Sequence, residues 1–119
     1  MALRVFQQSY HVPGALGAAI DIAFTAPFDM QLIHVSAVGS NSNAATFTIG
    51  TTSDDDLYLD DNDVGDSLVP ACYDHDDFVG GEFPHIVKGT VVEVTVDYNG
   101  PSAGTAVADL TIVLTFTEG

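Results

Sequence analysis

TVVEVTVDY, at residues 90–98, alternates apolar and polar side chains with a period of two. In an extended strand, side chains two residues apart point to the same face of the sheet. Val92, Val94 and Val96 therefore form one apolar face, and the residues between them form a polar face. This pattern predicts a strand with one face in a hydrophobic core and the other in water.

The residues that follow continue the pattern. NGPSAG, at residues 99–104, is rich in turn-forming residues, and a second apolar run occupies residues 106–117. Leu110 and Ile112 lie on the inward face of that run. We therefore expect 90–98 and 106–117 to be neighbouring antiparallel strands joined by a loop.

Further strand patterns precede this pair. We expect strands at residues 3–10, 19–25, 30–38 and 45–49, and shorter strands at 57–59, 67–73 and 85–87. At 30–38 both faces carry apolar side chains, so the pattern does not identify the inward face. No segment has the apolar stripe of a long helix, with its spacing of three to four residues. About eight short strands separated by turns predict an all-β chain: one antiparallel β-sandwich domain, jelly-roll-like, over residues 1–119.

The charge of the chain is strongly one-sided. It has 17 Asp and Glu residues against 2 Lys and Arg residues, a formal net charge of −15, yet 46% of its residues are hydrophobic. That apolar content favours a folded domain over a disordered acidic tail. Arg4 and Lys88 are the only cations. Two cations cannot neutralise a row of phosphates, so we expect no nucleic-acid partner, no anionic membrane partner and no ATP chemistry.

The cysteine content and the apolar segments of the sequence indicate the redox state and the cellular compartment of the protein. Cys72 is the only cysteine, which excludes an internal disulfide, and we interpret it as a small buried apolar residue rather than a catalytic thiolate. The first residues, MALRVFQQSYHV, lack the features of a signal peptide, and no run of apolar residues is long enough to span a membrane. We expect synthesis in the cytoplasm.

One acidic stretch, residues 53–66, is a candidate cation site. Ca²⁺ prefers several oxygen ligands on a turning backbone, and the candidate ligands are Asp60, Asp61, Asp63 and Asp66. The stretch does not match an EF-hand loop, because Val64 stands at the fifth position counted from Asp60. Two interpretations stay open, a structural calcium ion and a solvated acidic loop. No other cofactor is expected.

A second polar cluster, Asp74-His75-Asp76, allows two hypotheses about chemistry. Histidine and carboxylates together can bind a divalent metal or exchange protons, as in a small hydrolase. The chain has no nucleophile elbow, phosphate-binding loop or zinc-protease motif, so we predict that it is not an enzyme. Tyr58, within the acidic stretch, is the one aromatic residue that suggests a sugar-binding surface.

Four segments together resemble a known class of virion protein. Residues 23–38 read as an apolar strand, a bend at Pro27 and a longer strand, 44–50 as the next strand, and 89–98 with 106–116 as a closing hairpin. This order is similar to that of tailed-phage capsid decoration, or cement, proteins with a jelly-roll or β-tulip-like fold. The resemblance implies a homotrimer on the outer surface of the phage head, the major capsid protein as its partner, and no catalytic residues.

The last strand pattern offers a candidate subunit interface. Val107 and Val113 lie on the face of 106–117 that otherwise carries Asp109, Thr111 and Thr115. They would pack either against a neighbouring copy or against a covering loop of the same chain. The main alternative to a capsid protein is a carbohydrate- or receptor-binding module of a phage fibre or tail.

Overall fold

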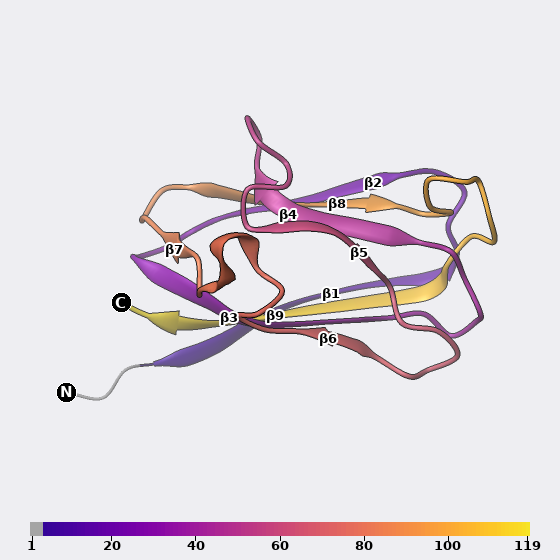
Figure 1. Cartoon of the computed structure of the whole chain (residues 1–119), viewed down its shortest axis with the longest axis horizontal. Coiled ribbons are helices and arrows are strands. Elements are labelled where there is room, and N and C mark those ends of the chain that lie inside the picture. Colours follow the sequence, from indigo (N-terminus) through magenta and orange to yellow (C-terminus); the bar gives the residue numbers. More distant parts are fainter. Residues whose placement is uncertain (1–3) are drawn as a thin grey trace.

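Residues 4–119 are the part of the chain that the structure, a computed structural model, describes. They form two antiparallel sheets that face each other, with the start of the first strand and the end of the last strand at one end of the sandwich (Figure 1). The elements are β1 (Val5–Ala15), β2 (Ile20–Thr25), β3 (Met30–Val38), β4 (Thr46–Thr51), β5 (Leu59–Asp63), β6 (Ala71–Tyr73), the 3₁₀ helix η1 (Val79–Gly81), β7 (His85–Ile86), β8 (Val91–Asp97) and β9 (Ala108–Glu118).

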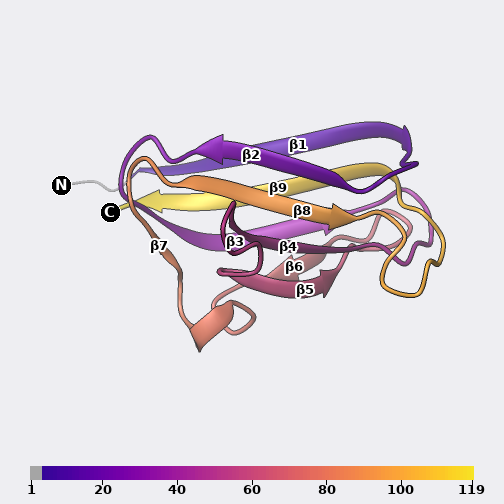
Figure 2. The same cartoon turned by 90° about the horizontal axis from the view of Figure 1, so that it is seen from above.

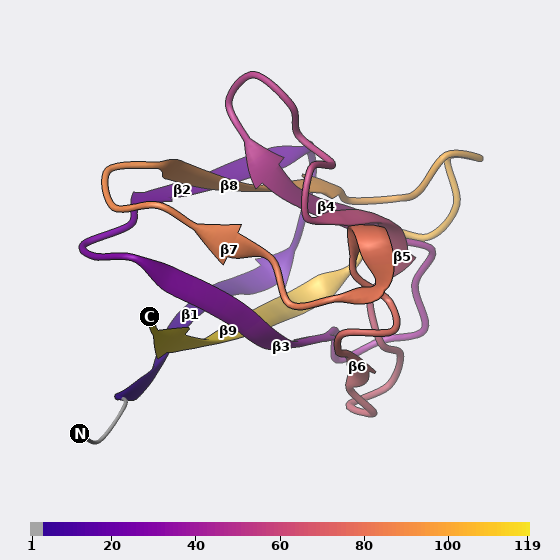
Figure 3. The ribbon, with the colours of Figure 1, turned by 60° about the vertical axis from the view of Figure 1, so that its left-hand side comes forward.

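The strand order is that of a jelly roll. One sheet has the order β1-β9-β3-β6, with β7 also pairing to β3, and the other has the order β2-β8-β4-β5. Figure 3 shows β2, β8 and β4 in one layer and β1, β9 and β3 in the other. The chain crosses repeatedly from one layer to the other and so wraps around a single core. The predicted all-β, jelly-roll-like sandwich is confirmed.

The predicted closing hairpin is wrong. β8 pairs with β2 and β4, whereas β9 pairs with β1 and β3 in the opposite sheet. A period of two identifies a strand but does not say which strand is its neighbour. The segment between β8 and β9 crosses the roughly 10 Å that separate two packed sheets, instead of turning back within one sheet.

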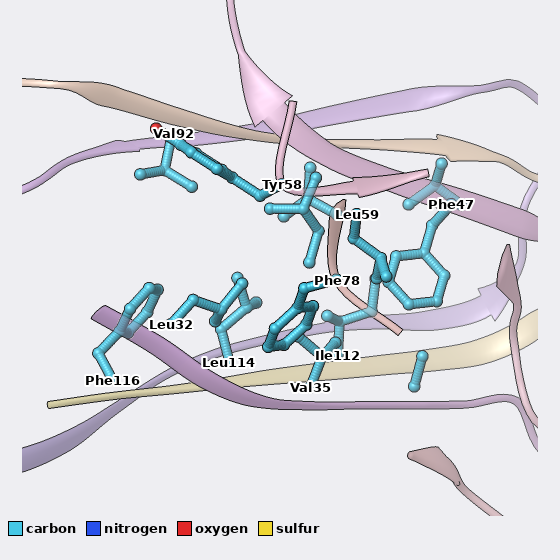
Figure 4. Packing of buried hydrophobic residues seen from close by; sticks show 14 of the residues in the cluster. Leu32, Val35, Phe47, Tyr58, Leu59, Phe78, Val92, Ile112, Leu114 and Phe116 are labelled. Atoms are coloured by element: carbon cyan, nitrogen blue, oxygen red, sulfur yellow. The ribbon is translucent and has the colours of Figure 1, made fainter. Parts of the chain in front are cut away.

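The core lies between the two layers, and the inward faces of β8 and β9 supply much of it (Figure 4). Val92, Val94 and Val96 from β8 are buried, as are Leu110 and Ile112 from β9, in agreement with the alternation in the sequence. Residues from β3, β4 and β5 complete the core, among them Leu32, Val35, Phe47 and Leu59.

An irregularity in β3 explains why its sequence has two apolar faces. Met30 and Leu32 are buried, and then the alternation shifts so that Val35 and Ala37 are buried. The shift is a bulge between Leu32 and His34 in the pairing with β9. A bulge inserts one extra residue and reverses the direction of every side chain after it. Each half of β3 therefore has one inward face, although the strand as a whole shows two.

A second irregularity overturns the prediction for Val107. Asp109 has a φ of 51°, in the left-handed region, and breaks the regular alternation at the start of β9. Val107, which precedes the break, turns into the core and is 0% exposed, and its backbone N–H donates to the carbonyl oxygen of Tyr98. Val107 is covered by its own chain and cannot contact a neighbouring copy.

The Asp109 side chain fixes this end of the sandwich. Its carboxylate accepts a hydrogen bond of 2.7 Å from the backbone N–H of Gly14 and another of 2.7 Å from the hydroxyl of Ser40. Donation from Gly14, and then from Ser40, lowers the pKa of Asp109 below the ordinary aspartate value of 3.8. The carboxylate thus ties the end of β1 and the β3–β4 loop to the start of β9.

Asp109→Asn is expected to lower the melting temperature at pH 7. Asparagine tolerates the left-handed backbone but accepts these hydrogen bonds without a negative charge. Because the pKa of Asp109 is lowered on folding, the stabilisation by its charge is complete well above 3.8, the value of the unfolded chain, and is lost as the pH falls from there through the lower pKa of the folded protein. The difference between wild type and variant should therefore shrink as the pH falls below 3.8. A difference that stays constant across thermal melts at pH 7 and pH 3 would contradict this account.

Candidate docking surface

The outer face of the β1-β9-β3-β6 sheet carries no charged side chain in the four cross-strand rows at its centre. Residues that pair directly across antiparallel strands share a face of the sheet. The rows are His11–Thr111–Val38, Ser9–Val113–Ser36, Gln7–Thr115–His34 and Val5–Thr117–Gln31. Cys72 of β6 adjoins Ser36, and His85 of β7 adjoins Gln31. We call these residues the neutral face. Within β9, the two carboxylates, Asp109 and Glu118, stand near the two ends of the strand.

The opposite sheet is acidic on its outer face. Asp21 alternates with the partly buried residues of β2, Glu93 and Asp97 alternate with the buried residues of β8, and Asp63 pairs with Thr46 at the edge of the sheet. We call these four carboxylates the acidic face. Nearby, partial burial raises the pKa of Asp61, and the carboxylates of Asp60 and Asp97 raise it further. The net charge of −15 is therefore distributed unequally over the two sides of the sandwich.

Val113 lies at the centre of the neutral face. It stands between Ser9 of β1 and Ser36 of β3, and its side chain is half-buried. Of the two valines proposed as contacts, only Val113 is therefore placed to meet another chain. Its role in an interface stays a prediction.

The candidate calcium ligands are not brought together. Asp60, Asp61 and Asp63 lie along the edge strand β5, where successive side chains point to opposite faces, and Asp66 follows the strand. The side chain of Asp66 instead accepts a hydrogen bond from the backbone N–H of Asn43. Among residues 4–119, no three of these four carboxylates lie within the mutual reach of a single metal ion.

Two other acidic groups do converge, and both are exposed. Asp54, Asp55 and Asp56 form one group, which the sequence reasoning did not single out, and Asp74-His75-Asp76 form the second. In the second, the Nε2 atom of His75 lies 3.2 Å from an oxygen of Asp76 and the His75 ring packs against Phe83. The hydrogen bonds of Asp74 and Asp77 are to backbone N–H groups of the same turn. These contacts account for the local geometry of the turn.

Tyr58 and Cys72 differ from their predicted environments. Tyr58 is 7% exposed and belongs to the core, so its ring is not on the surface to stack on a sugar. Burial also raises the pKa of its hydroxyl. Cys72, expected to be buried, is exposed on the short strand β6, because its side chain lies on the outer face beside Ser36.

No helix in residues 4–119 is long and apolar enough to cross a membrane. The part of the chain that the structure describes also contains no detectable pocket.

Comparison with known proteins gives one informative likeness. No protein family model matches the sequence, and no curated protein sequence matches it. Among solved structures, the chain is similar to a chain of the cyanophage Pam1 capsid asymmetric unit, with a TM-score of 0.60 and 15% sequence identity. The alignment covers 98% of this chain and 85% of that chain. At this identity the likeness shows a shared fold, which extends over the whole sandwich.

Proposed function

We propose that the protein is a structural virion protein: a capsid decoration, or cement, protein that binds the outer surface of a phage head and stabilises it. Its partner is the major capsid protein, its working form is a homotrimer, and it catalyses no reaction. The observation that carries the proposal is the likeness of nearly the whole chain to a chain of a phage capsid asymmetric unit.

The extent of that likeness supports a small capsid component. Because the alignment covers 98% of this chain and 85% of the other, the capsid chain is only modestly longer than 119 residues. The match therefore concerns a whole small subunit and not one domain of a large protein. A decoration protein of one sandwich domain is consistent with this size.

The distribution of charge supports an orientation on the shell. Carboxylates are costly to bury at an interface unless cations pair with them. The neutral face, centred on Val113, avoids that cost, so we place it against the shell. The acidic face, which includes Asp21 and Glu93, then points to solvent, where its charge remains hydrated.

A sedimentation assay with empty shells of the phage that encodes the chain tests the proposal. Wild-type protein is expected to co-sediment with the shells and to raise their melting temperature. Val113→Asp, at the centre of the neutral face, should bind about 100-fold more weakly, because each subunit then carries a desolvated carboxylate into the contact.

Val91→Asp is the matched control. Val91 lies on β8 in the opposite sheet, 37% exposed, so the same substitution adds the same charge away from the neutral face. It is expected to bind shells as the wild type does. Wild-type protein that neither binds nor stabilises the shells would contradict the proposed function. Equal weakening by both variants would contradict the proposed orientation.

A further inference from the structure

One side of the sandwich is open. β1 and β2 are the edge strands of the two sheets, and both lie on the same side of the molecule, opposite β5 and β6 (Figure 2). β1 pairs only with β9, and β2 pairs only with β8. Every second residue of an edge strand directs its N–H and C=O groups away from its one neighbour. Along residues 5–12 this side of β1 is therefore free to pair.

The core is incompletely covered on this side. Tyr10 pairs with Ile112 and so points to the interior, yet it is 42% exposed. Gln8, opposite Leu114, is also exposed on the inward face. Seven apolar residues pack against the core while remaining partly exposed, and all except Tyr73 lie at this side or at the ends of its two strands: Phe6, Leu16, Ile20, Ile22, Phe24 and Phe28.

Of the two edge strands, β1 also lacks the features that usually prevent strand pairing, whereas β2 carries Asp21 on its outer face. Charged side chains, short length and irregular geometry protect most natural edges. At the opposite side, β5 carries three aspartates and β6 has only three residues. β1 has eleven residues and no Asp, Glu, Lys or Arg, and its first proline is Pro13. We call β1 with β2 the open edge.

We propose that the open edge is the surface at which copies of this chain associate. A basic partner would be drawn to the acidic face and would gain nothing from an edge strand without charge. The absence of carboxylates on β1 favours a partner that is itself strongly acidic, and a second copy, with its net charge of −15, is such a partner. Association there adds backbone pairing to β1 and covers Tyr10 and the partly exposed residues of β2.

Light scattering after size-exclusion chromatography tests this inference with the wild type and three variants, Gln8→Glu, Thr52→Glu and Val113→Asp. Wild type is expected to associate, and more tightly in higher salt, because salt screens the repulsion between acidic copies. Gln8→Glu is nearly isosteric and adds one carboxylate to the open edge. It should raise the dissociation constant for self-association by about 100-fold. Thr52→Glu, in the exposed loop after β4, adds the same charge elsewhere and should leave self-association unchanged.

Melting curves of the Gln8→Glu variant separate loss of association from loss of folding. A wild type that is monomeric at all concentrations overturns the inference, as does a Gln8→Glu variant that associates like Thr52→Glu. If Val113→Asp dissociates the copies and Gln8→Glu does not, the copies associate through the neutral face, and the inference is also overturned. Wild type that is monomeric yet binds shells contradicts this inference and the homotrimer of the proposed function, but not the binding to the shell. Wild type that associates through β1 yet ignores shells contradicts only the proposed function.

Discussion

Val107→Asp is expected to prevent the protein from folding at neutral pH. The Val107 side chain is 0% exposed, and its Cγ2 atom lies so near Gly39 that a Cβ on Gly39 would be 2.6 Å from it. A carboxylate there would have neither water nor a cation, since Arg4 is paired with Glu118 and Lys88 is exposed. An unpaired buried charge costs about 3–5 kcal/mol or more, which is comparable with the whole stability of a small domain.

Val113→Asp is the matched control for this experiment. It makes the same chemical change six residues further along the chain, within β9, but Val113 is half-buried on the outer face between two serines. We expect the variant to remain folded, with a loss of at most about 1 kcal/mol in the free energy of unfolding. Urea denaturation followed by circular dichroism measures both variants. Equal losses for Val107→Asp and Val113→Asp would mean that Val107 is not buried in the folded chain.

These two valines show what the sequence reveals and what it does not. Val107 and Val113 are six residues apart, so strict alternation places them on one face. The rule holds from Leu110 to Phe116, and the core residues there could be predicted. It fails before Asp109, because a non-glycine residue with positive φ has no reliable sequence signal. The bulge in β3 went unrecognised because apolar side chains on both faces of a strand do not show where an extra residue is inserted.

Strand pairing was the second feature that the sequence did not reveal. The number of strands and their alternation predicted a sandwich, but the neighbours of each strand depend on contacts between distant residues. The neutral face shows the consequence. The sequence shows that β1 has no charged residue and that β9 has none between Asp109 and Glu118. Only the register of the strands shows that β1, β9 and β3 lie side by side. A surface made from three distant segments has no local motif.

The crossing from β8 to β9 should depend on Gly100. Its φ is 73°, and a Cβ added there would lie 2.1 Å from the carbonyl oxygen of Ala44 and 3.1 Å from the carbonyl carbon. A carbonyl group of the backbone cannot move aside as the end of a flexible side chain can. Gly100→Ala is therefore expected to lower the free energy of unfolding by about 3 kcal/mol or more, because strain at positive φ and overpacking add.

Gly81→Ala separates these two causes. Gly81 has a similar φ of 68°, but a Cβ added there would meet no atom within 4 Å. In this variant the free energy of unfolding should fall by only about 1 kcal/mol, which is the cost of placing alanine at a positive φ. Urea denaturation measures the free energy of unfolding of both variants. The additional loss in Gly100→Ala is the cost of the close contact with the Ala44 carbonyl group. If the two variants lose the same amount, the link after β8 does not pack against the segment before β4. The crossing between the sheets would then lack the contact that holds it in place.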